Sequence, residues 1–213
     1  MDKSLISAPI PTIRRLPKYI HMLKRLKIEN VLYVSATTIA HELKIEPILV
    51  RKDLSITGII GKPKVGFEVE ELIASITQFL NWNNTEDAFI IGVGALGEAI
   101  LGYSGFKDYG LNIIAGFDID KKKIGKKIFG VEILPLDSLE DLIKRMHINI
   151  GVLTVPASES QEICDSMVSS GIKAIWNFSP IALQVPDEVI LENVHLSQSL
   201  AVLTHKLAKK LKG

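Results

Sequence analysis

The chain has 213 residues, enough for one medium-sized domain or two small ones. Hydrophobic residues make up 47% and charged residues 23%, so the chain can bury a core and is not wholly disordered. Its one cysteine excludes an internal disulfide framework and a metal site made of cysteines alone. No apolar run approaches the ~20 residues that span a bilayer, and the first residues lack the apolar stretch of a signal peptide. We therefore expect a cytoplasmic protein that does not contact membranes.

The net charge of +1 hides an uneven distribution along the chain. Residues 1–67 contain 12 Lys and Arg but only 5 Asp and Glu, a net charge of +7, whereas residues 68–213 carry −6. A basic segment joined to an acidic one often binds a polyanion, and an ordinary scatter of surface charge is the alternative.

The basic segment begins with the pattern of a helix-turn-helix domain. We expect an irregular arm over residues 1–12 and then a helix over 13–28, with Pro17 tolerated in its first turn. Capping signals predict a second helix over 36–43 and a third over 47–54. Two short helices joined by a tight turn, with basic residues on the second, are typical of helix-turn-helix proteins.

A glycine-rich stretch follows these helices. Gly58–Phe67, which includes Lys62 and Lys64, predicts a short β-ribbon of the kind called a wing. A helix is expected over 68–80, and the polar, turn-forming residues 81–86 mark a domain boundary.

Beyond the boundary, strands alternate with helices. Strands are expected at residues 88–91, 112–117, 131–134, 148–155, 172–178 and 189–194. Helices are expected at residues 95–101, 138–146, 159–169 and 197–211. This alternation predicts an α/β fold with a doubly wound parallel sheet. The expected domains are therefore residues 1–80, residues 81–194 and a terminal helical segment over 195–213.

The first strand of the sheet leads directly into a glycine loop, Gly92-Val93-Gly94-Ala95-Leu96-Gly97. In a G-x-G-x-x-G motif between strand and helix, Gly92 allows the tight turn, Gly94 lets the backbone approach a pyrophosphate, and Gly97 permits close packing of helix on strand. Asp118 ends the next strand, where a carboxylate would accept hydrogen bonds from an adenosine ribose. The loop therefore predicts a dinucleotide site, and a purely structural turn is the alternative.

The choice between the two nicotinamide dinucleotides depends on the residues that surround Asp118. Its carboxylate favours NAD(H), because it would repel a 2′-phosphate. Lys121, Lys122 and Lys123 follow at once and would instead suit NADP(H), or would simply be a solvated turn.

Other candidates for cofactor contact lie at the ends of later strands, where sheets of this kind bind ligands. They are Val155, Pro156, Asn177, Phe178, Ser179 and Pro180, together with Tyr103 in the loop after the first helix. The five histidines lack the spacing of metal ligands, so no metal site is expected.

These segments together resemble the Rex family of bacterial redox-sensing transcriptional repressors, over nearly the whole chain. The matching segments are Thr12–Pro17, Val50–Ser55, Gly61-Lys62, Val65–Phe67, Gly92–Gly94, Gly102-Tyr103, Phe117-Asp118, Val155–Ala157 and Asn177–Pro180. The resemblance implies a winged helix-turn-helix domain, a Rossmann domain and a homodimer whose last helix inserts between the two domains of the partner subunit. It further implies that the protein binds a palindromic DNA operator and that reduced dinucleotide releases it.

The resemblance also assigns residues to roles. The residues expected to contact DNA are Arg14, Arg51, Lys52, Ser55, Lys62 and Lys64. Those expected to transmit the signal across the dimer are Arg15, Tyr103 and His195.

The chain departs from the family pattern at four positions. Ile56 stands where the family has Tyr, Pro63 where the wing has Arg, and Ala95 where the glycine loop has Asn. His195 replaces an Asp that engages Arg15 or Tyr103 across the dimer. An alternative is therefore a Rex paralog that binds NAD(P)(H) but has weak or lost specific DNA binding.

Two further function classes fit parts of the sequence. The glycine loop alone would suit an oxidoreductase, but the chain after Val155 is too short for a substrate domain and shows no acid–base pair, so we do not expect an enzyme. A coenzyme A-binding domain would use a similar sheet, and Tyr103 argues mildly against it.

Overall fold

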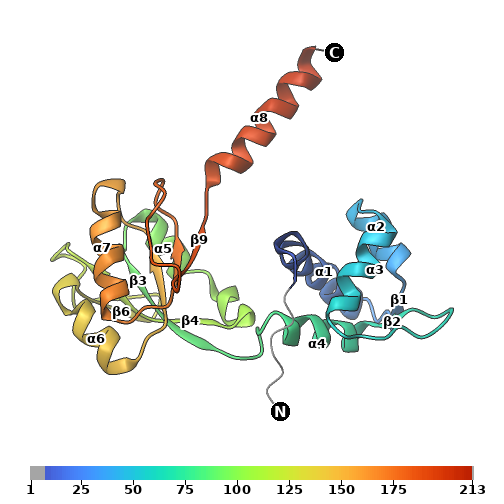
Figure 1. Cartoon of the computed structure of the whole chain (residues 1–213), viewed down its shortest axis with the longest axis horizontal. Helices are drawn as coiled ribbons and strands as arrows, with labels where there is room; N and C mark the ends of the chain where they lie inside the picture. The colour runs from blue at the N-terminus through green and yellow to red at the C-terminus, as the bar shows by residue number, and fades with distance from the viewer. Residues whose placement is uncertain (1–7, 213) are drawn as a thin grey trace. The chain divides into compact units, whose positions relative to one another are not determined.

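The computed structural model describes residues 8–212, and the chain divides into two compact units that meet between Asn84 and Thr85 (Figure 1). The first unit contains the helices α1 (Ile10–Ile28), α2 (Ala36–Leu43), α3 (Pro47–Ile56) and α4 (Val69–Phe79). Two short strands, β1 (Tyr33–Val34) and β2 (Phe67–Glu68), pair antiparallel. All four helices contribute to one core, whose fully buried members include Leu16, Leu23, Ile39, Val50, Leu54, Leu72 and Ile76.

Helix α1 begins earlier than the sequence predicted. Residues 10–12 belong to the helix rather than to an irregular arm, so Pro17 lies inside the helix and not in its first turn. Pro11 occupies the first turn instead, where a missing N–H costs little. Thr12 is buried and its hydroxyl donates to Asp53 of α3, and this long-range contact extends the helix towards its N-terminus.

The helix-turn-helix is built as the capping signals predicted. The Ser35 side chain accepts from the Thr38 N–H at 3.0 Å and caps α2. Lys44 ends α2 in the left-handed conformation with φ 54°, and Pro47 begins α3.

The wing is a tight turn closed by a bridge between Lys62 and Gly66. Gly66 has a φ of +105°, and a Cβ there would lie 2.4 Å from the Val34 carbonyl oxygen, so only glycine fits. This close approach seats the wing on β1.

The second unit is a seven-stranded sheet in the order β5-β6-β4-β3-β7-β8-β9. Its strands are β3 (Glu86–Ile91), β4 (Leu111–Asp118), β5 (Lys127–Ile128), β6 (Val131–Pro135), β7 (Ile150–Leu153), β8 (Ala174–Asn177) and β9 (Ile190–Asn193). All neighbouring pairs are parallel except β5–β6. Without β5 the order is that of a doubly wound Rossmann sheet, with β3 as its first strand and the switch point between β3 and β7.

Alternate residues of the central strands face opposite sides of the sheet. Phe89 and Ile91 point into a core under α6 (Leu139–Met146) and α7 (Ala157–Ser170). Ile90 points the other way, with Ile100 of α5 (Ala95–Leu101). The 3₁₀ turns η1 (Ser104–Tyr109) and η2 (Leu136–Ser138) complete the connections.

The last helix, α8 (Leu196–Lys212), is exposed along the whole part for which side chains are described. Leu200, Leu203 and Leu207 are between 52% and 64% exposed. A stripe of leucines at helical spacing is normally buried, so α8 presents an apolar face that the single chain leaves uncovered.

Candidate functional site

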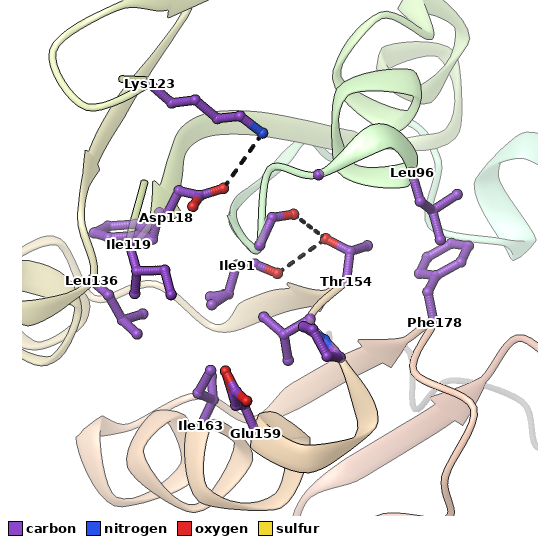
Figure 2. A pocket seen from close by; sticks show the side chains of 15 residues that line it. Ile91, Leu96, Asp118, Ile119, Lys123, Leu136, Thr154, Glu159, Ile163 and Phe178 are labelled. Carbon is purple, nitrogen blue, oxygen red and sulfur yellow. Dashed lines mark hydrogen bonds and ion pairs between the residues drawn. The ribbon is translucent and has the colours of Figure 1, made fainter. Parts of the chain in front are cut away.

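A cavity of about 500 Å³ opens where the central strands β3, β4 and β7 end (Figure 2). Seven of the residues expected to contact the cofactor line it, namely Gly92, Gly94, Leu96, Asp118, Val155, Pro156 and Phe178. Eight others line it as well, namely Ile91, Phe117, Ile119, Lys123, Leu136, Thr154, Glu159 and Ile163. The cavity lies at the switch point of the sheet, where doubly wound folds bind their ligands.

The glycine loop forms one side of the cavity. Gly92 has a φ of +89°, and a Cβ there would lie 2.7 Å from Val155 Cγ1, so the turn requires glycine. A Cβ at Gly97 would lie 2.2 Å from the Gly92 carbonyl oxygen, so α5 can approach β3 only through glycine. A Cβ at Gly94 would meet nothing within 4 Å. The loop is therefore closely packed at both ends and open at its centre, which leaves room for a ligand against the backbone.

Asp118 is fixed by the backbone that surrounds it. Its Oδ2 accepts from the Val93 N–H and its Oδ1 from the Asp120 N–H, both at 2.9 Å. Val93 is buried and Ala95 is exposed, and neither side chain lines the cavity. The carboxylate thus joins the end of β4 to the glycine loop, with lone pairs left for a further donor.

Only one of the three lysines after Asp118 turns into the cavity. Lys123 Nζ donates to the Val93 carbonyl oxygen and lies 3.3 Å from Glu98 Oε1 and 3.9 Å from Asp118 Oδ2. Lys121 and Lys122 are exposed and do not line the cavity. The positive charge beside Asp118 is therefore balanced by two carboxylates.

Thr154, which no sequence motif marks, connects β7 to β3. Its hydroxyl contacts the Ile91 carbonyl oxygen at 3.0 Å and the Gly92 carbonyl oxygen, so the turn after β3 is held from the neighbouring strand (Figure 2). The only sequence signal was a polar residue at the end of an apolar strand, directly before Val155 and Pro156.

The structure does not bring three of the strand-end candidates into the cavity. Asn177 is fully buried, and its amide donates to Asn193 Oδ1 at 2.8 Å and to the Ile181 carbonyl oxygen. Ser179 is also buried and accepts from the Ser160 hydroxyl at 2.6 Å. Pro180 is exposed and lies outside the lining. Asn177 and Ser179 thus shape the loop that carries Phe178.

Tyr103 lies outside the cavity lining and is 50% exposed. Its ring packs edge-on against Phe106 at 4.7 Å between centroids, Phe106 against Trp176 at 5.3 Å, and Trp176 against Phe178 at 4.6 Å. A row of four aromatic rings therefore connects Tyr103 to the cavity wall at Phe178.

The first unit presents exposed basic residues on α3 and the wing. Arg51, Lys52 and Ser55 are exposed on α3, where the Ser55 hydroxyl donates to the Lys52 carbonyl oxygen at 2.8 Å. Lys62 donates to the Tyr33 hydroxyl at 3.1 Å and lies 3.5 Å from Glu68 Oε2. Lys64 is exposed at the turn of the wing with a φ of 62°. Arg14 is exposed on α1.

A buried carboxylate joins α1 to α3. Asp53, 1% exposed, accepts from Arg15 Nε and Nη2 at 2.7 Å, from the Tyr19 hydroxyl at 2.6 Å and from the Thr12 hydroxyl at 2.9 Å. Burial by itself would raise the pKa of Asp53, but the hydrogen bonds from Arg15, Tyr19 and Thr12 outweigh it and hold the pKa below its ordinary value of 3.8. Arg15 is thus committed to a partner in its own unit.

None of the described helices is long and apolar enough to cross a membrane. Within the same residues, no group of three or more His, Cys, Asp and Glu side chains is arranged to hold a metal ion.

Two family models match the chain. One described as "CoA binding domain" matches residues 83–181, and one described as "Putative DNA-binding protein N-terminus" matches residues 7–55. The redox-sensing transcriptional repressor Rex of Treponema denticola is 50% identical over 193 residues, which are 91% of this chain and 92% of that protein. The chain belongs to the Rex family. The Rex of Bacteroides fragilis is 41% identical over 96% of this chain and 93% of its own length.

Solved Rex structures match the fold over nearly the whole chain. The crystal structure of RSP, a Rex-family repressor, in complex with β-NAD⁺ and operator DNA has a TM-score of 0.88 and 40% identity, covering 97% of this chain and 98% of the other. RSP in complex with β-NADH has a TM-score of 0.87 at 39% identity, covering 95% of each chain. The expected fold class, a winged-helix region followed by a Rossmann sheet and a terminal helix, is confirmed.

The positions at which the chain departs from the family pattern fall in both units. Ile56 is the last residue of α3 and is half-buried, whereas Pro63 is exposed in the wing. His195 is half-buried just before α8. None of the comparisons supports the alternative of a paralog that has lost specific DNA binding.

Proposed function

We propose that this Rex protein is a redox-sensing transcriptional repressor that binds a palindromic operator and is released by NADH. The observation that carries the proposal is the cavity at the switch point, formed by an open glycine loop and by Asp118, in a chain that is 40% identical to a Rex solved with NAD⁺ and operator DNA. A closed turn would have no such room at Gly94.

Each part of the cavity suits one part of a dinucleotide. The loop of Gly92, Gly94 and Gly97 would hold the pyrophosphate, with Val93, Ala95 and Leu96 completing the loop. Asp118 would accept from a ribose hydroxyl, since it keeps free lone pairs. Leu96 and Phe178 line the far end from Asp118 (Figure 2), and Val155 and Pro156 also belong to the lining. A reduced nicotinamide ring is uncharged and an oxidised one is a cation, so this apolar end favours the reduced form.

The same carboxylate distinguishes three candidate ligands. Both NADP(H) and coenzyme A carry a phosphate on the adenosine ribose, and Asp118 would repel it. Lys123 would not offset this, because Glu98 and Asp118 already surround its charge. NAD(H) is therefore the cofactor that the site favours, over NADP(H) and over coenzyme A.

The redox signal enters through this ligand and not through the protein's own thiol. Cys164 is fully buried, and burial, with a smaller contribution from Asp165, raises the pKa of its thiol to about 11. A thiol that is both buried and protonated is a poor target for oxidants. A role on DNA rather than in catalysis is supported by the similar proteins, which are named as repressors.

The basic face of the first unit would bind DNA. Arg51, Lys52 and Ser55 would enter the major groove on α3, and Arg14, Lys62 and Lys64 would contact phosphates or the minor groove. Reading a palindrome requires two copies, so we infer a homodimer that covers the leucine face of α8. Tyr103, His195 and Arg15 would then carry the signal between the two units and the two subunits, which for Arg15 requires that it exchange Asp53 for a new partner.

The test is an anisotropy titration on a palindromic duplex selected from a random pool. We expect specific binding that NAD⁺ leaves intact and that NADH weakens by about tenfold or more, since ligands shift equilibria only by differential affinity. Binding that is weak, independent of sequence or indifferent to NADH would contradict the proposal.

A further inference from the structure

Glu159 is the acidic residue of the cavity that the dinucleotide assignment does not yet use. It lies in the first turn of α7, and Figure 2 shows its side chain beside Ile163 at the edge of the cavity. The Ser158 hydroxyl donates to its Oε1 at 2.7 Å. Oε2 has no hydrogen-bond partner among the residues that the structure describes. One carboxylate oxygen is therefore available to a ligand.

Its position relative to Asp118 identifies the part of the ligand that it would meet. Asp118 marks the adenosine ribose, and Ile119 and Leu136 continue the wall from β4 towards β6. Glu159 and Ile163 face that same end of the cavity, whereas Leu96 and Phe178 lie at the other (Figure 2). The base attached to this ribose would thus lie between Ile119, Leu136 and Ile163, three apolar side chains suited to a flat ring.

Charge excludes a phosphate as the partner of Glu159. The N-terminus of α7 would otherwise attract an anion, but a carboxylate in its first turn compensates the helix dipole and repels phosphate. A carboxylate can only accept hydrogen bonds, so its partner must be a donor. Adenine offers one in its exocyclic amino group.

We propose that Glu159 determines base specificity by accepting a hydrogen bond from the 6-amino group of adenine. The inference rests on the proposed function, because it assumes a dinucleotide in this cavity. It predicts discrimination against hypoxanthine, in which a carbonyl oxygen replaces the amino group and would face the carboxylate oxygen.

The experiment compares NADH with its reduced hypoxanthine analogue by calorimetry on the full-length protein. We expect the wild type to bind NADH about tenfold more tightly than the analogue, as for a hydrogen bond to a charged group. Glu159→Ala should lose that preference through weaker binding of NADH. Glu159→Gln should bind both ligands within about threefold, because an amide can accept from one and donate to the other.

Glu162→Gln is the matched control, since it removes the same charge from an exposed position of the same helix that does not line the cavity. This variant should keep the full preference for NADH. Equal affinities in the wild type, an unchanged preference in Glu159→Ala, or the same shift in Glu159→Gln and Glu162→Gln would each overturn the inference. Failure of the wild type to bind NADH at all would instead contradict the proposed function.

Discussion

Asp53 is a buried, ionised residue that links two helices of the first unit. A buried carboxylate that accepts from Arg15, Tyr19 and Thr12 replaces all its water contacts with protein donors, so its removal leaves those donors unpaired. We expect Asp53→Ala to lower the free energy of unfolding by about 3–5 kcal/mol, measured by urea denaturation. Glu29→Ala, which removes an exposed pair with Arg25, should cost no more than about 1 kcal/mol. Equal effects of the two variants would contradict this role.

The same cluster gives the protein a defined response to acid. Because the pKa of folded Asp53 lies below its ordinary value of 3.8, the unfolded chain takes up the proton first as the pH falls. The stabilisation is therefore complete above about pH 4 and is lost as the pH falls through the lowered pKa. The stability difference between wild type and Asp53→Ala should shrink below pH 4, in urea denaturation curves recorded from pH 6 downwards. A constant difference would argue against an ionised Asp53.

Gly94 and Gly97 provide a paired test of the glycine loop. Gly94→Val should fold normally, because a Cβ there meets nothing within 4 Å, yet weaken NADH binding by about tenfold or more. Gly97→Ala should lower stability by about 1–3 kcal/mol, because its Cβ would lie 2.2 Å from the Gly92 carbonyl oxygen. Calorimetry with NADH and thermal denaturation measure the two effects. If Gly94→Val bound NADH with unchanged affinity, the assignment of the pyrophosphate to this loop would be wrong.

At the scale of single residues, the sequence predicted those site residues that belong to one short, continuous motif. The glycine loop and Asp118 follow from one strand, one turn and the next strand. Thr154 and Glu159 could not be predicted as cavity residues, because their place depends on which strands become neighbours. Asn177 does end a strand, as the sequence predicted, but only the fold shows that Asn193 and Ile181 accept from its amide.

At the scale of elements, α3 and the wing should contribute differently to DNA binding. Arg51 lies on the helix expected to contact base edges, so Arg51→Ala should cost about 1–3 kcal/mol on the preferred operator and little on other sequences. Lys64→Ala should weaken binding equally on all sequences and lower the salt slope by about one. Anisotropy titrations at several salt concentrations separate the two. If Arg51→Ala lost the same affinity for every duplex, Arg51 would contact phosphates and not base edges.

Helices and strands could be predicted because each has its own hydrophobic period and its own capping residues. Some of their boundaries could not be predicted. The sequence places Pro17 in the first turn of a helix, and the structure places it inside α1, because contacts with α3 extend the helix. The two-residue strands β1 and β5 are too short for any periodic signal and exist only through pairing with β2 and β6.

At the scale of the whole molecule, the exposed leucine face of α8 predicts a second chain that covers it. Its leucine face is uncovered in one chain, and such a stripe is stable in water only when buried. Truncation after Asn193 should therefore convert dimers into monomers or aggregates in sedimentation velocity experiments. A well-behaved dimer without α8 would show that the interface lies elsewhere. The alternation of strands and helices predicts a doubly wound parallel sheet. The way in which two chains would assemble depends instead on the side chains that α8 leaves exposed.

The contacts of Asp53 with Thr12 and Arg15, which join α3 to α1, also determine how the start of α1 moves. Helix ends usually fray, and their amide protons exchange quickly with solvent. Here Thr12 and Arg15, in the first two turns of α1, are tied to Asp53 across 41 and 38 residues of sequence. Opening that end of the helix would expose a carboxylate and a guanidinium together, so it opens only when α3 also detaches. In hydrogen exchange, the first turns of α1 should therefore become labelled together with α3, and more slowly than either end of α8.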